Sequence, residues 1–238
     1  MKIPRVLPRL FFTRSTVIVA KQLLGKYLVF QTAPETPLVG KIVETEAYRG
    51  MEDKACHASW RKRESCEVLW GEPGKAYVYL TYGMHNMFNV VTEKDGLPAA
   101  VLIRALEPVE GLKYMESNRE LSHSSLRVHP KQSQSDCHIS ASRRILAMTG
   151  HKTMDTPTIL YRLTSGPGKL TQAFGITYKN HNGLDVTSGR ILWIEDRGDR
   201  VKPSELMVGQ RIGVAYAGEW ATKPWRFYIR DNPYVSKK

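Results

Sequence analysis

The sequence is poor in cysteine and has no long apolar run. Its three cysteines, Cys56, Cys66 and Cys137, form no C-x-x-C pair, which argues against a disulfide framework. Cys56 precedes His57, but no second pair with metal-ligand spacing accompanies them, so we expect no metal site. Because no segment has the character of a membrane span or a secretion signal, we expect an intracellular protein in the cytoplasm, nucleoid or nucleus, with no membrane partner.

Acidic residues are also scarce relative to basic ones. The chain has 35 Lys and Arg against 23 Asp and Glu, a formal net charge of +12. Such a surplus favours a polyanionic partner, because contacts to phosphates release condensed counterions. It is equally compatible with a basic, soluble surface, so charge alone leaves both interpretations open. The apolar fraction of 42% excludes a disordered chain and is sufficient for a sizeable core.

Apolar periodicity predicts a single α+β domain over residues 1–238, with a curved, mainly antiparallel sheet and surrounding helices. The polar stretch 51–73 is expected to be a long functional loop, and 122–135, rich in Ser, His and Lys, a mobile insertion. Strands are expected at 27–32 and 38–46 (paired as a hairpin), 77–80, 88–92, 100–106, 190–195 and 210–215. Helices are expected from Ser15 or Thr13 to Gly25, at 109–119, at 139–148 and from Gly166 onward.

Two carboxylates stand at the end of a predicted strand, just before the polar loop. With period-two alternation, Glu44, Glu46 and Tyr48 face the same way. Strand ends that lead into loops are common positions for catalytic carboxylates. The alternative is a solvated polar face on an edge strand, and without further context this alternative is favoured.

An aromatic group follows the polar loop. Tyr77 and Tyr79 share one strand face, Tyr82 stands at the next turn beside Gly83, and His57 lies in the loop itself. One interpretation is cross-strand packing. The other is a platform on which a nucleobase stacks, with an aromatic wedge at a turn that could enter a duplex. Aromatic side chains on a basic protein are what nucleobase recognition requires.

Two polar residues, Asn89 and Arg104, lie on predicted paired strands. Taken singly, each is expected to be structural. An arginine beside a carboxylate, however, would lower the carboxylate's pKa and keep it ionised. Near the end of the chain, residues 218–228 interleave bases with aromatics, as in a docking surface or the packed end of a domain, and packing is favoured for the tryptophans.

Five segments in register resemble the alkyladenine (3-methyladenine) DNA glycosylase family. Each motif is weak alone, but their order and spacing hold from about Leu10 to Ser236, nearly the whole chain. The segments are GKIVETEAY at 40–48, YVYLTYGM at 77–84, LIRALEP at 102–108, GPGKL at 166–170 and AGEW at 217–220.

The resemblance implies roles for individual residues. Glu46 would be the general base that deprotonates the attacking water, with Arg104 and the main-chain carbonyl of Ile212 helping to hold that water. Asn89 would exclude guanine by crowding its 2-amino group. The remaining implied positions are those of the base pocket, Tyr48, Ala55, His57 and Tyr79, and those that enter the duplex, Tyr82 and Met84.

The resemblance therefore implies a monofunctional DNA glycosylase that initiates base excision repair. Its substrate would be double-stranded DNA with damaged purines, of the 3-methyladenine type and including hypoxanthine or ethenoadenine. It would act as a monomer, without cofactor and without AP lyase activity. The alternative is a non-catalytic nucleic-acid-binding module, related to the tRNA-binding C-terminal domain of formyltransferases.

Overall fold

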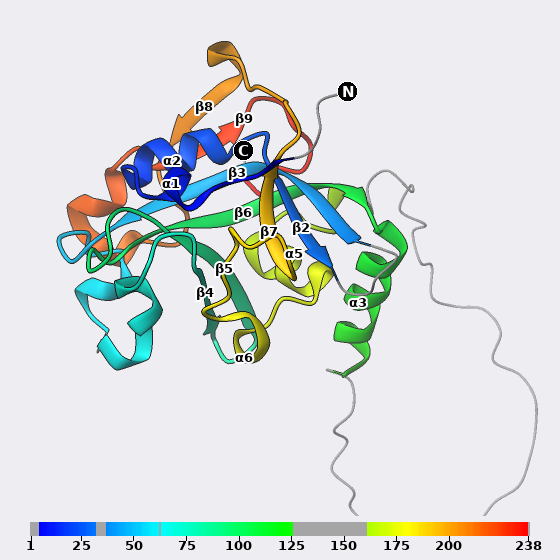
Figure 1. Ribbon diagram of the computed structural model, residues 1–238, viewed down its shortest axis with the longest axis horizontal. Helices are drawn as coiled ribbons and strands as arrows, with labels where there is room; N and C mark the ends of the chain where they lie inside the picture. The colour runs from blue at the N-terminus through cyan, green and yellow to red at the C-terminus, as the bar shows by residue number, and fades with distance from the viewer. Residues whose placement is uncertain (1–4, 32–36, 62, 126–160, 238) are drawn as a thin grey trace, which may run out of the picture.

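The computed structural model describes residues 5–31, 37–61, 63–125 and 161–237. They form one α+β domain around a nine-stranded, antiparallel sheet (Figure 1). The strand order is β1-β7-β2-β3-β6-β5-β4, and β9 pairs with both β3 and β8. The strands are β1 (Arg5–Val6), β2 (Tyr27–Gln31), β3 (Pro37–Arg49), β4 (Ala76–Thr81), β5 (His85–Val91), β6 (Ala99–Glu110), β7 (Leu192–Asp196), β8 (Leu206–Gly209) and β9 (Arg226–Ile229).

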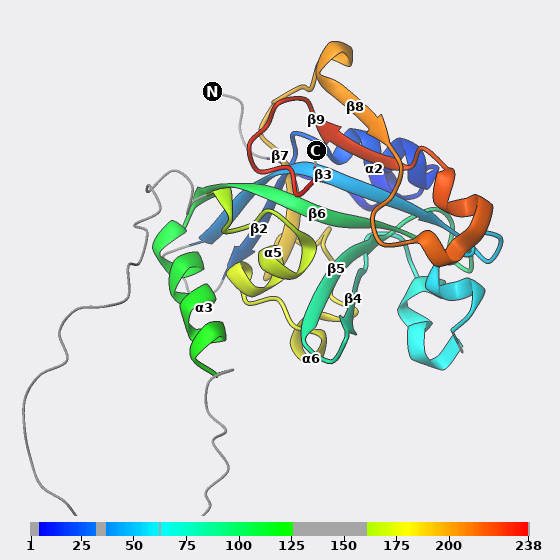
Figure 2. The same cartoon turned by 180° about the vertical axis from the view of Figure 1, so that it is seen from behind.

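Helices and 3-10 turns surround the sheet (Figure 1, and from behind in Figure 2). The α-helix α2 packs against β3 and β6, whereas α5 packs against β5 and β6. None of the helices in the described ranges is long and apolar enough to cross a bilayer. The helical elements are α1 (Arg9–Phe12), α2 (Thr16–Leu23), η1 (His57–Ser59), η2 (Arg63–Trp70), α3 (Leu112–Ser125), α5 (Pro167–Phe174), α6 (Tyr178–His181), η3 (Pro203–Glu205) and η4 (Ala215–Thr222).

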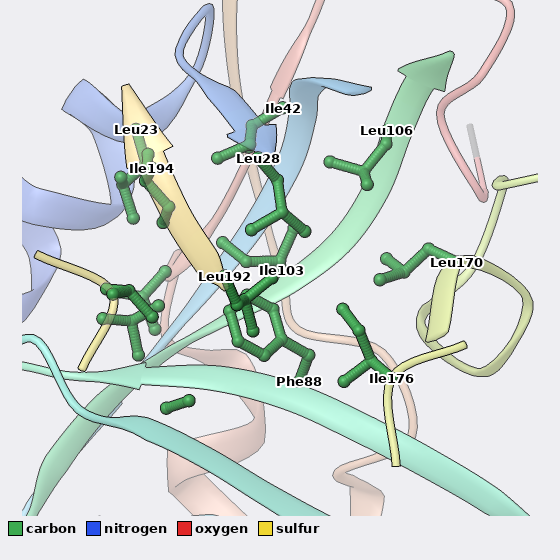
Figure 3. Packing of buried hydrophobic residues seen from close by; sticks show 14 of the residues in the cluster. Leu23, Leu28, Ile42, Phe88, Ile103, Leu106, Leu170, Ile176, Leu192 and Ile194 are labelled. Atoms are coloured by element: carbon green, nitrogen blue, oxygen red, sulfur yellow. The ribbon is translucent and has the colours of Figure 1, made fainter. Parts of the chain in front are cut away.

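The main core lies between the sheet and these helices (Figure 3). Its side chains come from alternate positions of the strands and from the apolar sides of α2 and α5, so each element buries one face. Among the labelled residues are Leu23 of α2, Leu28, Ile42, Phe88, Ile103 and Leu106 of the strands, and Leu170 of α5.

The middle of β3 is enclosed on both edges. Residues Glu44, Thr45 and Glu46 pair with β6 on one side and with Tyr228, Phe227 and Arg226 of β9 on the other. Register shifts flank Glu44, where the strand bends between its two partners. With both edges paired and both faces covered, all three side chains are fully buried. The fold therefore places two carboxylates in its interior.

The sequence-based assignments hold for the central strands and for the helices at α2 and α5. The hairpin of β2 and β3 is confirmed. The polar stretch 51–73 is not a plain loop, because it contains η1 and η2. Cys66 and Leu69 of η2 pack against Tyr77, Val91 and Ala100 of the sheet.

One assignment needs new bounds and another is wrong. The helix expected at 109–119 is present, but it begins at Leu112, because β6 continues to Glu110 and Gly111 makes the turn with φ of 79°. This helix runs to Ser125, so the first part of the expected insertion 122–135 is helical. The rest of that insertion and the helix expected at 139–148 lie outside the described residues. No strand forms at 210–215, where Gly213 has φ of 79° and Arg211 turns inward.

Candidate active site

Glu46 lies on β3 with its carboxylate held by three donors. The backbone N–H of Ile212 donates to Oε1 over 2.7 Å, and the hydroxyl of Tyr48 donates to Oε2 over 2.8 Å. Nη1 of Arg104 lies 3.3 Å from Oε2. Each carboxylate oxygen can accept two hydrogen bonds, so Oε1 keeps capacity for one further donor such as a water.

Glu46 belongs to a buried network of alternating charges. Nε of Arg104 also lies 3.2 Å from Oε1 of Glu44, and Nε of Arg226 lies 2.7 Å from the same oxygen. The N–H of Ser236 donates to the other oxygen of Glu44 over 2.7 Å. Two carboxylates thus face two guanidinium groups. The charges balance, which is the condition under which buried ions are tolerated.

The pKa of Glu46 reflects this arrangement. Burial raises it above its ordinary value, because the anion has lost its water. The cation of Arg104, the N–H of Ile212 and the hydroxyl of Tyr48 oppose that rise, whereas the second carboxylate, Glu44, adds to it. Glu46 is therefore a stronger base than an exposed glutamate.

A ring of aromatic side chains stands beside this carboxylate. Nδ1 of His57 lies 2.7 Å from the hydroxyl of Tyr77, and the His57 ring meets Tyr79 edge to face at 4.3 Å. Burial, with help from the cation of Arg61, lowers the pKa of His57 to about 3. His57 is consequently neutral at physiological pH.

These groups open onto a cleft of about 1030 Å³. Glu46 does not itself line the cleft, but all three groups that bind it do. A narrow recess leads off the cleft, because Tyr48, Ala55, His57 and Tyr79 line both. Asn89 lines the recess, with its amide donating to the carbonyls of Tyr77 and Met87. The cleft is lined among others by Tyr48, Ala55, His57, Tyr79, Tyr82, Arg104 and Ile212.

The turn between β4 and β5 projects apolar side chains into solvent. Tyr82 is 88% exposed and Met84 is 58% exposed. Both central residues of the turn, Tyr82 and Gly83, have positive φ (51° and 67°), and the N–H of Met84 donates to the carbonyl of Thr81. This is the geometry of a tight type I′ turn, which presents Tyr82 on a short, well-defined tip at the edge of the cleft.

The structure therefore brings together almost all the residues singled out in the sequence. Glu46, Tyr48, Ala55, His57, Tyr79, Asn89, Arg104 and Ile212 converge at the cleft and its recess or directly behind them, and Tyr82 lies at its rim. Met84 stands on the same turn as Tyr82. For Ile212 the structure shows its N–H donating to Glu46, whereas the role expected for its carbonyl stays a prediction.

Sequence reasoning missed a second buried ion pair that braces the site. The guanidinium of Arg211 contacts both oxygens of Asp53, at 2.5 and 2.8 Å, and both side chains are fully buried. Arg211 also donates to the carbonyls of Ala47 and Trp220, while Asp53 accepts from the N–H of Ala55. This pair ties strand β3 to both segments that wall the cleft. No sequence signal distinguished Asp53 from the other charged residues of its loop.

No group of three or more potential metal ligands occurs in the described ranges. The side chains of Cys56 and Cys66 are buried, and burial raises the pKa of both thiols. Their thiols are therefore protonated at neutral pH and unsuited to nucleophilic chemistry.

Comparison with known proteins matches residues 10–233 to the model of the methylpurine-DNA glycosylase (MPG) family. Curated relatives bear the provisional name 3-methyladenine DNA glycosylase. One from Methanocella arvoryzae is 46% identical over 98% of this chain and 96% of its own. Others, from Carboxydothermus hydrogenoformans and Alkaliphilus oremlandii, are 43% and 42% identical, over 98% of this chain and 100% and 99% of theirs. Since both the family model and these relatives span nearly the whole chain, the protein belongs to the methylpurine-DNA glycosylase family.

Proposed function

We propose that this protein is a monofunctional DNA glycosylase that flips alkylated or deaminated purines out of duplex DNA and hydrolyses their N-glycosidic bond. The observation that carries the proposal is the position of Glu46, a buried carboxylate of raised pKa directly behind a cleft walled by aromatic rings. The basic charge of the chain suits double-stranded DNA as the partner, bound by a monomer.

The first step is extrusion of the nucleotide. A stacked base cannot reach a carboxylate inside a protein, so it must leave the duplex at a cost of a few kcal/mol, which is smallest for a damaged pair. Tyr82, exposed on its tight turn, is suited to fill the space the base vacates, and Met84 lies beside it.

The second step is recognition in the cleft. Tyr48, Tyr79 and neutral His57 offer faces and edges on which a purine stacks, worth about 1–3 kcal/mol per base. Asn89 is fixed by two carbonyls at the recess, so it presents a rigid boundary to a 2-amino group. A guanine would lose hydrogen bonds there without replacing them.

The third step is hydrolysis. Glu46 accepts a proton from a water that Arg104 and the carbonyl of Ile212 help to orient. The water oxygen bonds to the anomeric carbon, the C–N bond breaks, and its electron pair leaves with the purine. An oxocarbenium-like transition state is stabilised by the nearby carboxylate. Water is the nucleophile here and no lysine amine takes part, so the sugar–phosphate backbone stays intact.

Glu46→Gln tests the proposal, with Glu107→Gln as a control on a carboxylate outside the cleft lining. Single-turnover release should be measured from duplexes containing 3-methyladenine, hypoxanthine or ethenoadenine. Loss of a general base lowers the rate by about 10²–10⁴-fold, while lesion binding persists. Release by the variant at the wild-type rate refutes the role of Glu46.

Two further readouts separate the alternatives. Strand breaks should appear only after alkali treatment of the product, and breaks without alkali would contradict a monofunctional enzyme. In competition, a lesion-containing duplex should displace structured RNA. Preference for RNA together with no base release would favour the non-catalytic RNA-binding module.

A further inference from the structure

Arg61 is a cation at the cleft that none of the proposed steps uses. It follows η1, with its N–H bonded to the carbonyl of His57 over 2.8 Å. Its guanidinium lies 5.1 Å from the ring of Trp60 and 5.8 Å from the ring of Tyr79. All four residues line the cleft, and Trp60 also meets His57 edge to face at 5.2 Å. The side chain is therefore held over one wall of the cleft by aromatic contacts.

The charge of Arg61 is not cancelled locally. Arg61 forms no ion pair with a carboxylate in the part of the chain that the structure describes. The buried charges near the cleft are balanced: Glu44 and Glu46 face Arg104 and Arg226, and Asp53 faces Arg211. Exposed Lys54, which also lines the cleft, adds a further positive charge.

The pKa of His57 indicates how strongly a positive charge is disfavoured at this wall of the cleft. Its imidazole touches Tyr79, where a bound purine would stack, and the cation of Arg61 helps to disfavour its protonated form. A purine with a positive charge seated against the same rings meets the same repulsion. A neutral purine does not.

We infer that Arg61 is a specificity-determining residue, which biases the cleft toward neutral damaged purines and against cationic ones. The inference rests on the proposed glycosylase function and deepens it. Hypoxanthine and ethenoadenine are neutral in DNA, whereas 7-methylguanine and 3-methyladenine carry a positive charge on the ring. Stacking on tyrosine favours the cations, and Arg61 offsets part of that preference.

The size of the effect follows from the geometry. The guanidinium of Arg61 lies 5.8 Å from the ring of Tyr79, so a purine stacked on that ring would lie within roughly 10 Å of the guanidinium. At an effective dielectric constant near 20, two unit charges at that distance repel enough to change a rate or binding ratio by about tenfold. Solvent in the open cleft reduces this, so we expect a change of about threefold to tenfold.

The test compares Arg61→Gln with the matched variant Arg63→Gln. Arg63 lies on the same loop and also stacks on a tryptophan, at 4.7 Å from the ring of Trp70, but does not line the cleft. For each protein, single-turnover release is measured from two duplexes of identical sequence, one with 7-methylguanine and one with hypoxanthine. The ratio of the two rates within each variant cancels any general loss of DNA binding.

In Arg61→Gln the ratio of 7-methylguanine to hypoxanthine release should rise about threefold to tenfold over the wild type. In Arg63→Gln it should stay within twofold. An unchanged ratio, or an equal loss on both lesions that marks Arg61 as a phosphate contact, overturns the inference. A wild-type protein that releases neither of these bases, and neither 3-methyladenine nor ethenoadenine, refutes the proposed function itself, whereas release of 3-methyladenine alone overturns only the inference on Arg61.

Discussion

Replacing Arg104 should move the pH dependence of base release in a defined direction. Arg104 is the cation nearest to Glu46, with Nη1 at 3.3 Å, and it is the largest influence that opposes the rise in the pKa of Glu46 on burial. In Arg104→Met that opposition disappears while burial and Glu44 remain. The pKa of Glu46 therefore rises further, and the carboxylate is ionised only at higher pH.

The magnitude can be worked from the distance. An opposite charge within about 4–6 Å typically shifts a carboxyl pKa by 1–3 units, and Arg104 lies inside that range. A general base works only when ionised, so release falls as pH drops through the pKa of Glu46. The acid limb of the rate profile should move about one to three pH units toward higher pH in Arg104→Met. At high pH the variant should recover much of its rate.

Single-turnover rates on one lesion, measured between pH 5 and 9.5, check this expectation. Arg104→Lys is the matched control, since it keeps the charge and should leave the limb within about half a unit of the wild type. Circular dichroism and lesion binding establish that both variants are folded. An acid limb that stays in place in Arg104→Met, with a uniformly lower rate, would show that Arg104 does not set the ionisation of Glu46.

Other predictions concern Tyr82, which would enter the duplex, the ion pair of Arg211 and Asp53, and the buried charge of Glu46. Tyr82→Ala should weaken retention of a lesion duplex far more than salt-sensitive binding to undamaged DNA, and equal losses in a filter-binding assay would remove the wedge role. Arg211→Met leaves the buried carboxylate of Asp53 without its cation and should lower the free energy of unfolding by about 3–5 kcal/mol in urea titrations. A decrease below about 1 kcal/mol would contradict the stabilising role of the Arg211–Asp53 pair. The raised pKa of Glu46 means that the folded state binds the extra proton, so stability is lost as pH rises from about 4.5 (the ordinary value) through the folded pKa. Glu46→Gln should therefore melt at a higher temperature than the wild type at pH 8, with a gap that narrows toward pH 4.5.

The shared face of three site residues could be predicted because a strand has a fixed period, but their burial could not: the local pattern favoured a solvated edge strand, whereas β3 is paired on both edges at Glu44 and Glu46. Glu44, Glu46 and Tyr48 were expected on one side of a strand, and in the structure Arg104 contacts both carboxylates while Tyr48 donates to Glu46. The turn that carries Tyr82 was also expected, since glycine directly follows it. Local patterns were sufficient in these places because the geometry is local.

The C-terminal part of the site could not be predicted, because its geometry depends on contacts between residues far apart in the sequence. Residues 210–215 have the apolar composition of a strand, but Arg211 reaches a carboxylate 158 positions earlier in the chain. That tertiary contact overrides the local preference, as does Gly213 at positive φ. Strand β9 is only four residues long and follows Pro224, so it gave little signal although it encloses Glu46. Of the two interpretations of 218–228, β9 supports the packed end of a domain.

The second carboxylate of β3 has a use that follows from the shared cation. Arg104 serves Glu44 through Nε and Glu46 through Nη1, and Glu44 also raises the pKa of Glu46 by its own charge. Glu44→Gln removes both effects of Glu44 on Glu46. Arg104 then pairs with Glu46 alone, and the negative charge that raised the pKa of Glu46 is gone. The pKa of Glu46 should fall, so the acid limb moves toward lower pH, opposite to Arg104→Met.

A weaker base also removes a proton less readily, so the plateau rate of Glu44→Gln should decline even though Glu46 is ionised over a wider range. The pH–rate profiles of Glu44→Gln and Arg104→Met on the same lesion should therefore shift in opposite directions. A site that is merely unfolded or loosened would not produce opposite shifts. If the acid limbs of the two variants move in the same direction, the sharing of Arg104 between Glu44 and Glu46 does not set the pKa of Glu46. If the two acid limbs move in opposite directions as expected, Glu44 keeps Glu46 basic enough to activate water.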